Sequence, residues 1–192
     1  ELTGVSVEVA IEDSLLQVQQ TLVLNLADSI SSFEIKALQF EGTSLNFLGA
    51  TLEGNNLVVT DTPAKGMDRF KLSKEEGKTW SEVVCTYEAK VTSKQFYLPL
   101  LFTTFSAATS ENDFSMQLHM PKTQNYTLLF PTVKLEESLN QTNKVIRLEV
   151  PALPAFLRLQ RQEEDQSTLS LNDTVDLMAV FLFLGIALLI WF

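Results

Sequence analysis

Apolar and polar residues alternate with a period of two at the start of the chain. Residues 5–12 carry valine or isoleucine at every odd position, and residues 16–26 carry leucine or valine at positions 16, 18, 22, 24 and 26. Successive side chains of a strand point to opposite sides of its sheet, so this alternation is typical of a strand with one buried face. Glu12, Asp13 and Ser14 between the two segments supply turn chemistry. We therefore predict a β-hairpin with one buried and one solvated face.

The same alternation returns along the rest of the first 159 residues. It is present in residues 33–38, 44–52, 56–61, 81–91, 114–120 and 144–150, with a turn signal at Gly54-Asn55-Asn56. Strands at such regular spacing favour a mainly β fold, and we expect an antiparallel, Ig-like β-sandwich domain over residues 1–159. This part of the sequence has no Gly-rich phosphate loop, no internal repeat and no helical pattern longer than two turns.

The C-terminal residues 176–192 depart from this pattern. Residues 177–192 form a run of sixteen without a charged side chain, which as a helix is about 24 Å long at about 1.5 Å per residue. A bilayer core is about 30 Å thick, and Thr174 and Val175 extend the run outward. A buried core helix is disfavoured because the segment has no polar face. We predict a transmembrane helix anchored by Leu177, Phe181, Leu184, Leu188, Trp191 and Phe192, with the last two at the membrane interface.

Residues 160–175 are polar and weakly periodic, and they stand between the predicted domain and the predicted anchor. We expect a juxtamembrane stalk that keeps the domain clear of the lipid headgroups. No Lys or Arg follows residue 176, so the positive-inside rule has nothing to count on that side. Because the sequence starts at Glu1 rather than at a methionine, we expect a removed leader and a domain on the periplasmic or extracellular side. A tail-anchored protein facing the cytosol is the alternative.

Charge and cysteine content narrow the classes of partner. The 192 residues include 14 basic and 24 acidic ones, which gives a formal net charge of −10. Such a chain repels the phosphates of nucleic acids, so we expect no nucleic-acid partner. Cys85 is the single cysteine, which excludes an intrachain disulfide and a cysteine-rich zinc site within these residues. Sequons at Asn125, Asn140 and Asn172 decide nothing about the source, since some arise by chance.

The sequence offers few groups for catalysis or metal binding. Its one histidine, His119, alternates onto the face opposite the apolar residues of its segment, whereas Cys85 falls in the apolar phase. We predict a solvent-facing histidine and a buried thiol that is not a nucleophile. No H-E-x-x-H or G-x-S-x-G motif is present, and we expect no enzyme, no metal and no cofactor. The alternative is a carboxylate-based enzyme that uses Glu82, Glu88 and Asp113, brought together by the fold.

Two apolar stretches with prolines, residues 95–105 and 151–159, break the alternating pattern. Proline is excluded from central strands, so we expect both stretches at sheet edges or in loops, where large apolar side chains are harder to bury. An exposed apolar patch marks a binding surface. The alternative is that the stretches fold under the sandwich as part of its core. The predicted partner-binding residues are Phe96, Tyr97, Leu98, Leu100, Leu101, Phe102, Leu153, Phe156 and Leu157.

The anchor, the β domain and the apolar stretches together predict binding rather than catalysis. We expect a single-pass membrane protein that is an accessory or interaction subunit of a larger membrane complex. Its partners are then integral membrane proteins, with lipid contact through the C-terminal helix. Anchoring restricts the domain to the membrane plane and raises its effective concentration toward a membrane partner. The alternative is an adhesion or ligand-binding receptor ectodomain. No motif in the sequence identifies the partner or ligand.

Overall fold

A computed structural model describes residues 1–105, 114–121, 125–132, 136–139, 143–150 and 153–162. Residues Glu1–Gln162 form one compact unit, and the described residues all belong to it. The described part is mainly β and contains no helix. The prediction of a mainly β domain is therefore confirmed.

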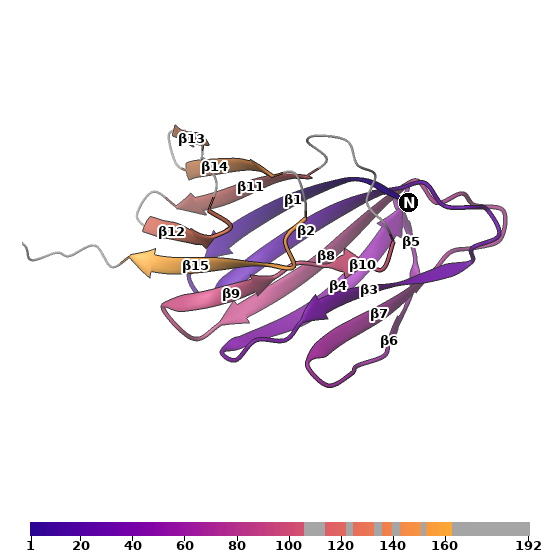
Figure 1. The fold of residues 1–192 in the computed structure, drawn as a ribbon, viewed down its shortest axis with the longest axis horizontal. Helices are drawn as coiled ribbons and strands as arrows, with labels where there is room; N and C mark the ends of the chain where they lie inside the picture. The colour runs from indigo at the N-terminus through magenta and orange to yellow at the C-terminus, as the bar shows by residue number, and fades with distance from the viewer. Residues whose placement is uncertain (106–113, 122–124, 133–135, 140–142, 151–152, 163–192) are drawn as a thin grey trace, which may run out of the picture. The chain divides into compact units, whose positions relative to one another are not determined.

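The largest element is an eight-stranded sheet (Figure 1), whose strands lie in the order β13-β14-β11-β1-β2-β8-β4-β5. Their bounds are β1 (Leu2–Glu12), β2 (Leu15–Leu24), β4 (Thr43–Leu52), β5 (Asn55–Asn56), β8 (Glu82–Val91), β11 (Phe114–Pro121), β13 (Glu136–Leu139) and β14 (Asn143–Val150). This sheet forms one layer of the domain and contains all but two of the segments in which the sequence predicts strands.

Two smaller sheets lie over one face of the eight-stranded sheet (Figure 1). A four-stranded sheet has the order β10-β3-β7-β6 and a three-stranded sheet the order β12-β15-β9. Their bounds are β3 (Ser32–Leu38), β6 (Val58–Asp61), β7 (Met67–Ser73), β9 (Gln95–Pro99), β10 (Phe102–Thr103), β12 (Asn125–Phe130) and β15 (Phe156–Gln162). The chain thus builds two layers, the second of which is divided into two sheets.

The predicted N-terminal hairpin is confirmed as β1 and β2. Their antiparallel register places Val9 opposite Val18 and closes at the pair of Glu12 and Leu15. The turn is tight because Asp13 adopts a φ of 53°, a left-handed conformation that aspartate tolerates better than most residues. The odd positions of residues 5–12 are at most 6% exposed, which also confirms the predicted buried face.

The direction of one strand pair differs from the prediction. β1 pairs antiparallel with β2 but parallel with β11, with Val5 beside Phe114. The expectation that all strands pair antiparallel is wrong at this position, and the eight-stranded sheet is mixed. Alternation along a strand reports which face is buried and says nothing of the direction of its neighbour. Roughly one hundred residues separate the two strands, so no hairpin turn holds them antiparallel.

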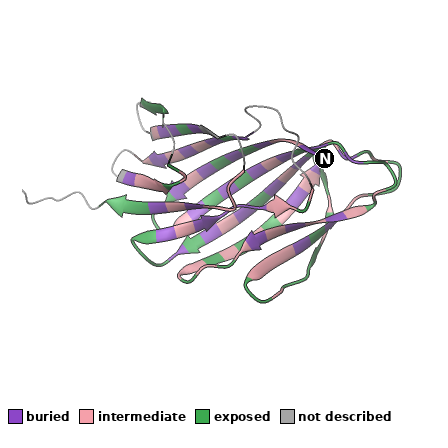
Figure 2. Cartoon of the chain, viewed as in Figure 1, coloured by how far each residue is buried: buried purple, intermediate pink, exposed green. Residues whose placement is uncertain are grey.

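The core lies between the eight-stranded sheet and the two smaller sheets. One continuous cluster of buried side chains draws residues from strands of all three sheets. Figure 2 shows the underlying pattern, in which buried positions alternate with more exposed ones along the strands. Each large apolar side chain that is buried in this way contributes about 1.5–3 kcal/mol relative to an exposed one. The hydrophobic alternation of the sequence is therefore the main source of stability of this fold.

The β domain extends three residues beyond its predicted end at residue 159. β15 continues to Gln162, so residues 160–162 of the predicted stalk are part of a strand. Arg161 donates its backbone N–H to the carbonyl of Lys94 at 2.8 Å, which extends the attachment of this end. The remainder of the predicted stalk, and the predicted transmembrane helix with its six anchoring residues, lie outside the described residues. In the part of the chain that the structure describes, no helix is long and apolar enough to span a bilayer.

Candidate functional site

Four aromatic side chains form a continuous cluster on the outer side of the three-stranded sheet. Phe40, Tyr97, Phe130 and Phe156 are called the aromatic surface below. Phe40 stacks on Tyr97 with the ring centroids 4.7 Å apart, and Phe130 stacks on Phe156 at 5.0 Å. Phe156 also meets Phe40 and Tyr97 edge to face, at 5.2 and 5.5 Å. Each such pair contributes about 0.5–1.5 kcal/mol beyond the area it buries, so the rings hold one another in place.

The strand period explains why these rings face outward. In β9 both neighbours of Tyr97 are buried, and in β15 the residue that follows Phe156 is buried, so the alternation turns both rings away from the core. Phe130 is the last residue of β12. Phe40 comes from the connection between β3 and β4, and Thr43 Oγ1 attaches this connection to β9 by donating to the Tyr97 carbonyl at 3.0 Å. Three strands and one loop therefore position the aromatic surface.

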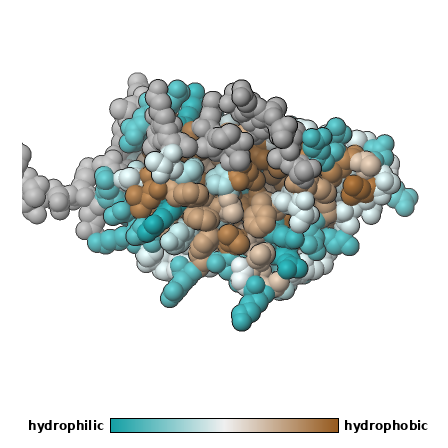
Figure 3. Space-filling model, viewed as in Figure 1, coloured by the Kyte–Doolittle hydropathy of each residue, from teal (hydrophilic) through white to brown (hydrophobic). Residues whose placement is uncertain are grey.

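The aromatic surface is partly open to solvent. Phe130 is 41% exposed, while Phe40, Tyr97 and Phe156 have intermediate exposure. Figure 3 shows hydrophobic residues gathered in the middle of this face, with hydrophilic residues below and beside them. An exposed apolar patch with a polar rim is typical of a binding site.

Arg158 adds a cation to the aromatic surface. It lies two residues after Phe156 on the same face of β15, directly opposite Tyr97 in the register. Its guanidinium carbon is 5.7 Å from the centroid of the Tyr97 ring, within the range of a cation–π interaction. Aromatic residues and arginine are enriched in protein–protein interfaces and among the residues that contribute most of their binding energy. The composition of this surface is therefore that of an interface centre.

The structure divides the nine predicted partner-binding residues. Phe96, Leu98, Leu100, Leu101 and Leu157 are at most 2% exposed, whereas Tyr97, Phe102, Leu153 and Phe156 have intermediate exposure. The prediction that the five buried side chains lie on a surface is corrected, since they are part of the core. Pro99 does end an edge strand, as predicted, but the edge or loop position predicted for residues 151–159 is wrong for β15, which is the central strand of its sheet. An edge strand is open along its backbone only, and the inner face of β9 is covered by the larger sheet.

Only Tyr97 and Phe156 of the predicted residues belong to the aromatic surface. Leu153 packs against the core, and Phe102 lies on β10 opposite Lys36 of β3. Sequence reasoning missed Phe40, Phe130 and Arg158. For Phe40 a signal was present, because it falls in the even phase, opposite to the buried odd positions 33, 35 and 37.

Gln20 connects the two layers beneath this site, and sequence reasoning missed it as well. Its side chain is fully buried, its Nε2 donates to the carbonyl of Leu101 at 2.6 Å, and its Oε1 accepts the N–H of Leu101 at 2.9 Å. The Tyr87 hydroxyl has its one proton within reach of two acceptors, the Pro99 carbonyl at 3.1 Å and Gln20 Oε1 at 3.4 Å. The sequence signal is the one polar residue in the apolar phase of β2. The amide thus pairs with a peptide group as a neighbouring strand would.

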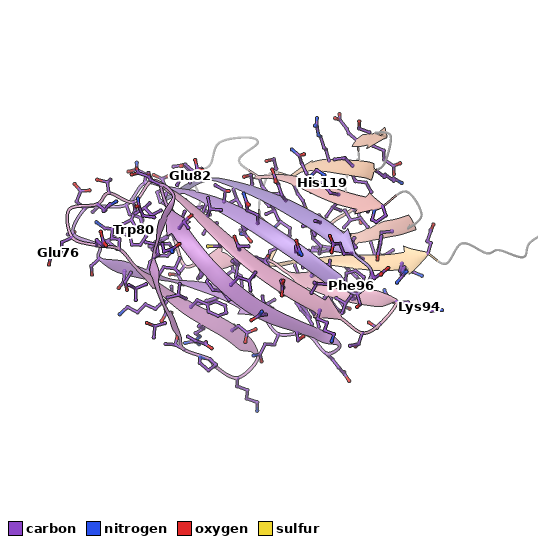
Figure 4. The ribbon with its side chains drawn as sticks, turned by 180° about the vertical axis from the view of Figure 1, so that it is seen from behind. Glu76, Trp80, Glu82, Lys94, Phe96 and His119 are labelled. Atoms are coloured by element: carbon purple, nitrogen blue, oxygen red, sulfur yellow. The ribbon has the colours of Figure 1, made fainter. Side chains whose placement is uncertain are left out.

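The candidate catalytic groups are buried or lie apart. Cys85 is buried as predicted, and burial raises the pKa of its thiol to about 12. Burial also raises the pKa of Tyr87, with the Cys85 thiolate as the smaller cause. His119 is partly exposed on the face opposite its buried neighbours. Figure 4 shows Glu82 and His119 on β8 and β11, which two strands separate.

The carboxylates of the alternative enzyme model share no site among the described residues. Glu82 is exposed, Glu88 lies six residues along the same strand, and Asp113 lies outside the described residues. Within those residues, no group of three or more His, Cys, Asp or Glu side chains is placed to share a metal ion.

Comparison with known proteins finds no matching family model and no matching curated protein. Solved structures with a similar fold include an M1 zinc metallopeptidase from Deinococcus radiodurans, with a TM-score of 0.53 at 10% identity over 83% of this chain and 42% of that one. Yeast LTA4 hydrolase in complex with bestatin has a TM-score of 0.53 at 7% identity, over 84% of this chain and 28% of that one. This chain thus spans less than half the length of these proteins, and identity at this level shows a shared fold alone.

Proposed function

We propose that the chain is a membrane-anchored β-sandwich module, a non-catalytic accessory or interaction subunit of a larger membrane protein complex. It binds an integral membrane partner through the aromatic surface. The observation that supports this most directly is the packing of four rings and Arg158 on the outside of the three-stranded sheet. These side chains are pre-positioned by contacts with one another, so binding orders few additional side chains and costs little conformational entropy.

A protein partner fits this surface better than a lipid headgroup or nucleic acid. The net charge of −10 repels anionic lipids and phosphate backbones alike. Rigid rings beside an arginine instead match the composition of interface centres. Water is excluded there, and a few residues contribute most of the binding free energy. Phe130, the most exposed of the four rings, is then the side chain that inserts deepest into the partner.

The apolar run of residues 177–192 supplies the membrane half of the proposal. As a transmembrane helix it keeps the domain within reach of the membrane plane, and confinement raises the effective concentration toward a membrane partner. We do not propose peptide hydrolysis from the similar fold of the metallopeptidases, because the similarity covers less than half of each of those chains. We therefore assign binding, and no reaction, to this module.

The proposed binding is tested by purifying the tagged full chain from its native membranes in a mild detergent. We expect a fixed set of integral membrane proteins to co-purify with the wild type at defined stoichiometry. Phe130→Ser is expected to lose this set, because it removes the exposed ring without placing a charge in the fold. Val23→Ser is the matched control, since Val23 is also 41% exposed but lies on β2, away from the rings.

The results separate the alternatives. Loss of the set in Phe130→Ser alone supports the proposal, and equal retention in both variants excludes the aromatic surface as the contact. A chain that purifies alone excludes the subunit function, and the receptor alternative would then be tested with soluble ligands.

Membrane anchoring has a test of its own. We expect the wild type to stay in the pellet after alkaline carbonate extraction, whereas Leu184→Arg with Leu188→Arg is released, because each arginine costs about 2.5–3.5 kcal/mol near the centre of a bilayer. A wild type that carbonate extracts would contradict the anchor.

A further inference from the structure

One strand of the eight-stranded sheet has an open edge. β4 pairs with β8 along its whole length, but on its other side it pairs with β5 only at Thr51 and Leu52. The carbonyl of Ala50 is also used, because it accepts the N–H of Leu57 at 2.9 Å. Among the described residues, no strand lies against the remaining stretch 44–49 on this side.

Of the usual protections against strand pairing, this open edge has only a bulge. Natural edge strands are blunted by charged residues, by proline or by bulges. Residues 44–49 read Ser-Leu-Asn-Phe-Leu-Gly and contain neither a charge nor a proline. A bulge between Phe47 and Gly49 is present, but it leaves the apolar side chain of Leu48 55% exposed rather than covering the edge. An edge of this kind favours pairing with another extended segment.

A groove runs along the open edge, and it is called the edge groove below. It has a volume of about 610 Å³, which is within the range of about 300–1,000 Å³ that is usual for ligand sites. Its second wall comes from β6, the outermost described strand of the four-stranded sheet (Figure 1), and from the neighbouring β7. Phe47 and Phe70 stack at 4.4 Å and connect the two walls. Leu45 of β4, Val59 of β6 and Leu57 from the connection between β5 and β6 add apolar side chains to its lining.

Two carboxylates give the edge groove a charge. Asp61 lies opposite Phe70 in the pairing of β6 with β7, and Asp68 lies two residues before Phe70, so the two acids are diagonal neighbours on one face. Asp68 Oδ1 accepts a hydrogen bond from Gln39 Nε2 at 2.7 Å, which holds this side chain in place. The groove is therefore apolar along Phe47 and Phe70 and acidic beyond them.

We propose that the edge groove binds an extended segment of a partner protein, which adds to β4 as a further strand along residues 44–49. Six residues of strand span about 20 Å at about 3.3 Å per residue, so the open edge pairs with a segment of similar length. Main-chain hydrogen bonds supply the affinity of such strand addition, and alternate side chains supply the specificity. One apolar side chain of the segment packs over Phe47 and Phe70, and a lysine or arginine pairs with Asp61 and Asp68.

Charge complementarity selects this occupant over a second copy of the chain. Two acidic grooves brought edge to edge would place their carboxylates together, and each chain carries a net charge of −10. A cationic segment instead gains from the same charges. The edge groove shares no residue with the aromatic surface, so this inference is independent of the proposed function.

The experiment selects random eight-residue peptides on phage against the full chain in mild detergent, and then measures synthetic peptides from the enriched pool. We expect alternating apolar residues with at least one lysine or arginine. We expect Leu48→Lys, which charges the open edge, to weaken binding at least tenfold, and alternate N-methylation of the peptide backbone to do the same. Asp61→Asn with Asp68→Asn is expected to weaken binding about fivefold. Bound peptide is also expected to slow amide hydrogen exchange within residues 44–49.

Control variants test whether the loss of peptide binding is specific to the edge groove. Val23→Lys adds the same charge to an exposed strand position opposite Glu82 and is expected to leave peptide binding unchanged, as is Phe130→Ser. Absence of any enriched peptide, or peptides that bind Leu48→Lys as well as the wild type, would overturn the proposal. A dimer of the wild type that Leu48→Lys dissociates would overturn it too, because a second copy would then be the occupant.

Discussion

The two faces of the three-stranded sheet are built by the same strands and have opposite properties. On the inner face Phe96, Leu98 and Leu157 are at most 2% exposed and pack against the eight-stranded sheet. On the outer face Tyr97 and Phe156, their immediate neighbours in sequence, pack on other rings and stay partly open. Both faces are apolar, so apolar character alone does not distinguish the residues that form the core from those that form the outer surface. The two-residue period of the strand makes this distinction, because it determines which side chains point into the core.

The largest effect that separates the two faces is expected for adjacent residues of β15. Leu157→Ala leaves a cavity in the core and is expected to lower the free energy of unfolding by about 2–5 kcal/mol. Phe156→Ala removes three ring contacts but no core side chain, and we expect a loss about half as large. Urea unfolding of the full chain in mild detergent, followed by far-UV circular dichroism, measures both. A larger loss for Phe156→Ala would mean that the outer rings, and not the inner face, hold the sheet in place.

The second effect concerns the amide beneath the inner face. Gln20→Leu leaves the N–H and the carbonyl of Leu101 buried without their partner, at about 1–3 kcal/mol for each group. We expect a loss of about 3 kcal/mol in the free energy of unfolding. Gln19→Leu, one residue earlier on the exposed face of β2, is expected to change it by less than about 0.5 kcal/mol. Equal effects of the two substitutions would show that the layers are held by apolar contacts alone.

The sequence was informative about strands because their buried face leaves a direct trace in it. The odd positions of β1 and the even positions of β2 predict a hairpin, and the structure confirms it. Strand direction leaves no such trace, which is why the parallel pair of β1 and β11 was not predicted. The three-stranded sheet was missed for a related reason, since the prolines near β9 and β15 were taken to indicate an exposed edge. Edge position concerns hydrogen bonding in the plane of the sheet, whereas burial depends on what lies above and below it.

The aromatic surface was predictable only in part. Tyr97 and Phe156 were singled out for their apolar neighbourhood, although that neighbourhood is the core itself. Phe40 and Phe130 come from regions far apart in sequence, and only the fold places their rings beside Phe156. Gln20 was the clearer signal, because a polar residue in an apolar phase needs a buried partner. Its partner, the backbone of Leu101, has no side-chain signature and is found only in the structure.

A third and smaller effect is the pH dependence of stability that comes from the buried thiol of Cys85. Burial raises the pKa of Cys85 to about 12, above its ordinary value of 9.0, so above pH 9 the unfolded chain loses this proton while the folded chain keeps it. Stability is therefore fully present below pH 9 and falls as the pH rises toward 12, by about 1.4 kcal/mol per pH unit. Between pH 8 and pH 10 we expect the wild type to lose about 1.4 kcal/mol more than Cys85→Ala, measured by urea unfolding.

Tyr87 sets the limit of this comparison. Its pKa is raised by burial and, to a smaller extent, by the Cys85 thiolate, so the release of a second proton by the unfolded chain above pH 10 affects the wild type and Cys85→Ala differently. The difference between the two proteins is therefore read below pH 10. The same pH dependence in both would contradict a thiol that stays protonated in the folded chain.

The smallest effect on stability is expected at Arg158, where the comparison of the two faces is sharpest. Arg158→Lys keeps the charge and loses the planar group above Tyr97, and an exposed cation–π contact of this kind is worth about 0.5–1 kcal/mol. Arginines at interface centres contribute about 2 kcal/mol or more to binding, so we expect the co-purified partner to decrease at least tenfold while unfolding hardly changes. Arg161→Lys, on the same strand but outside the aromatic surface, is the control for both measurements. If Arg158→Lys lowered stability by several kcal/mol and left the partner bound, the outer face would be structural as well, and the distinction between the two faces would fail.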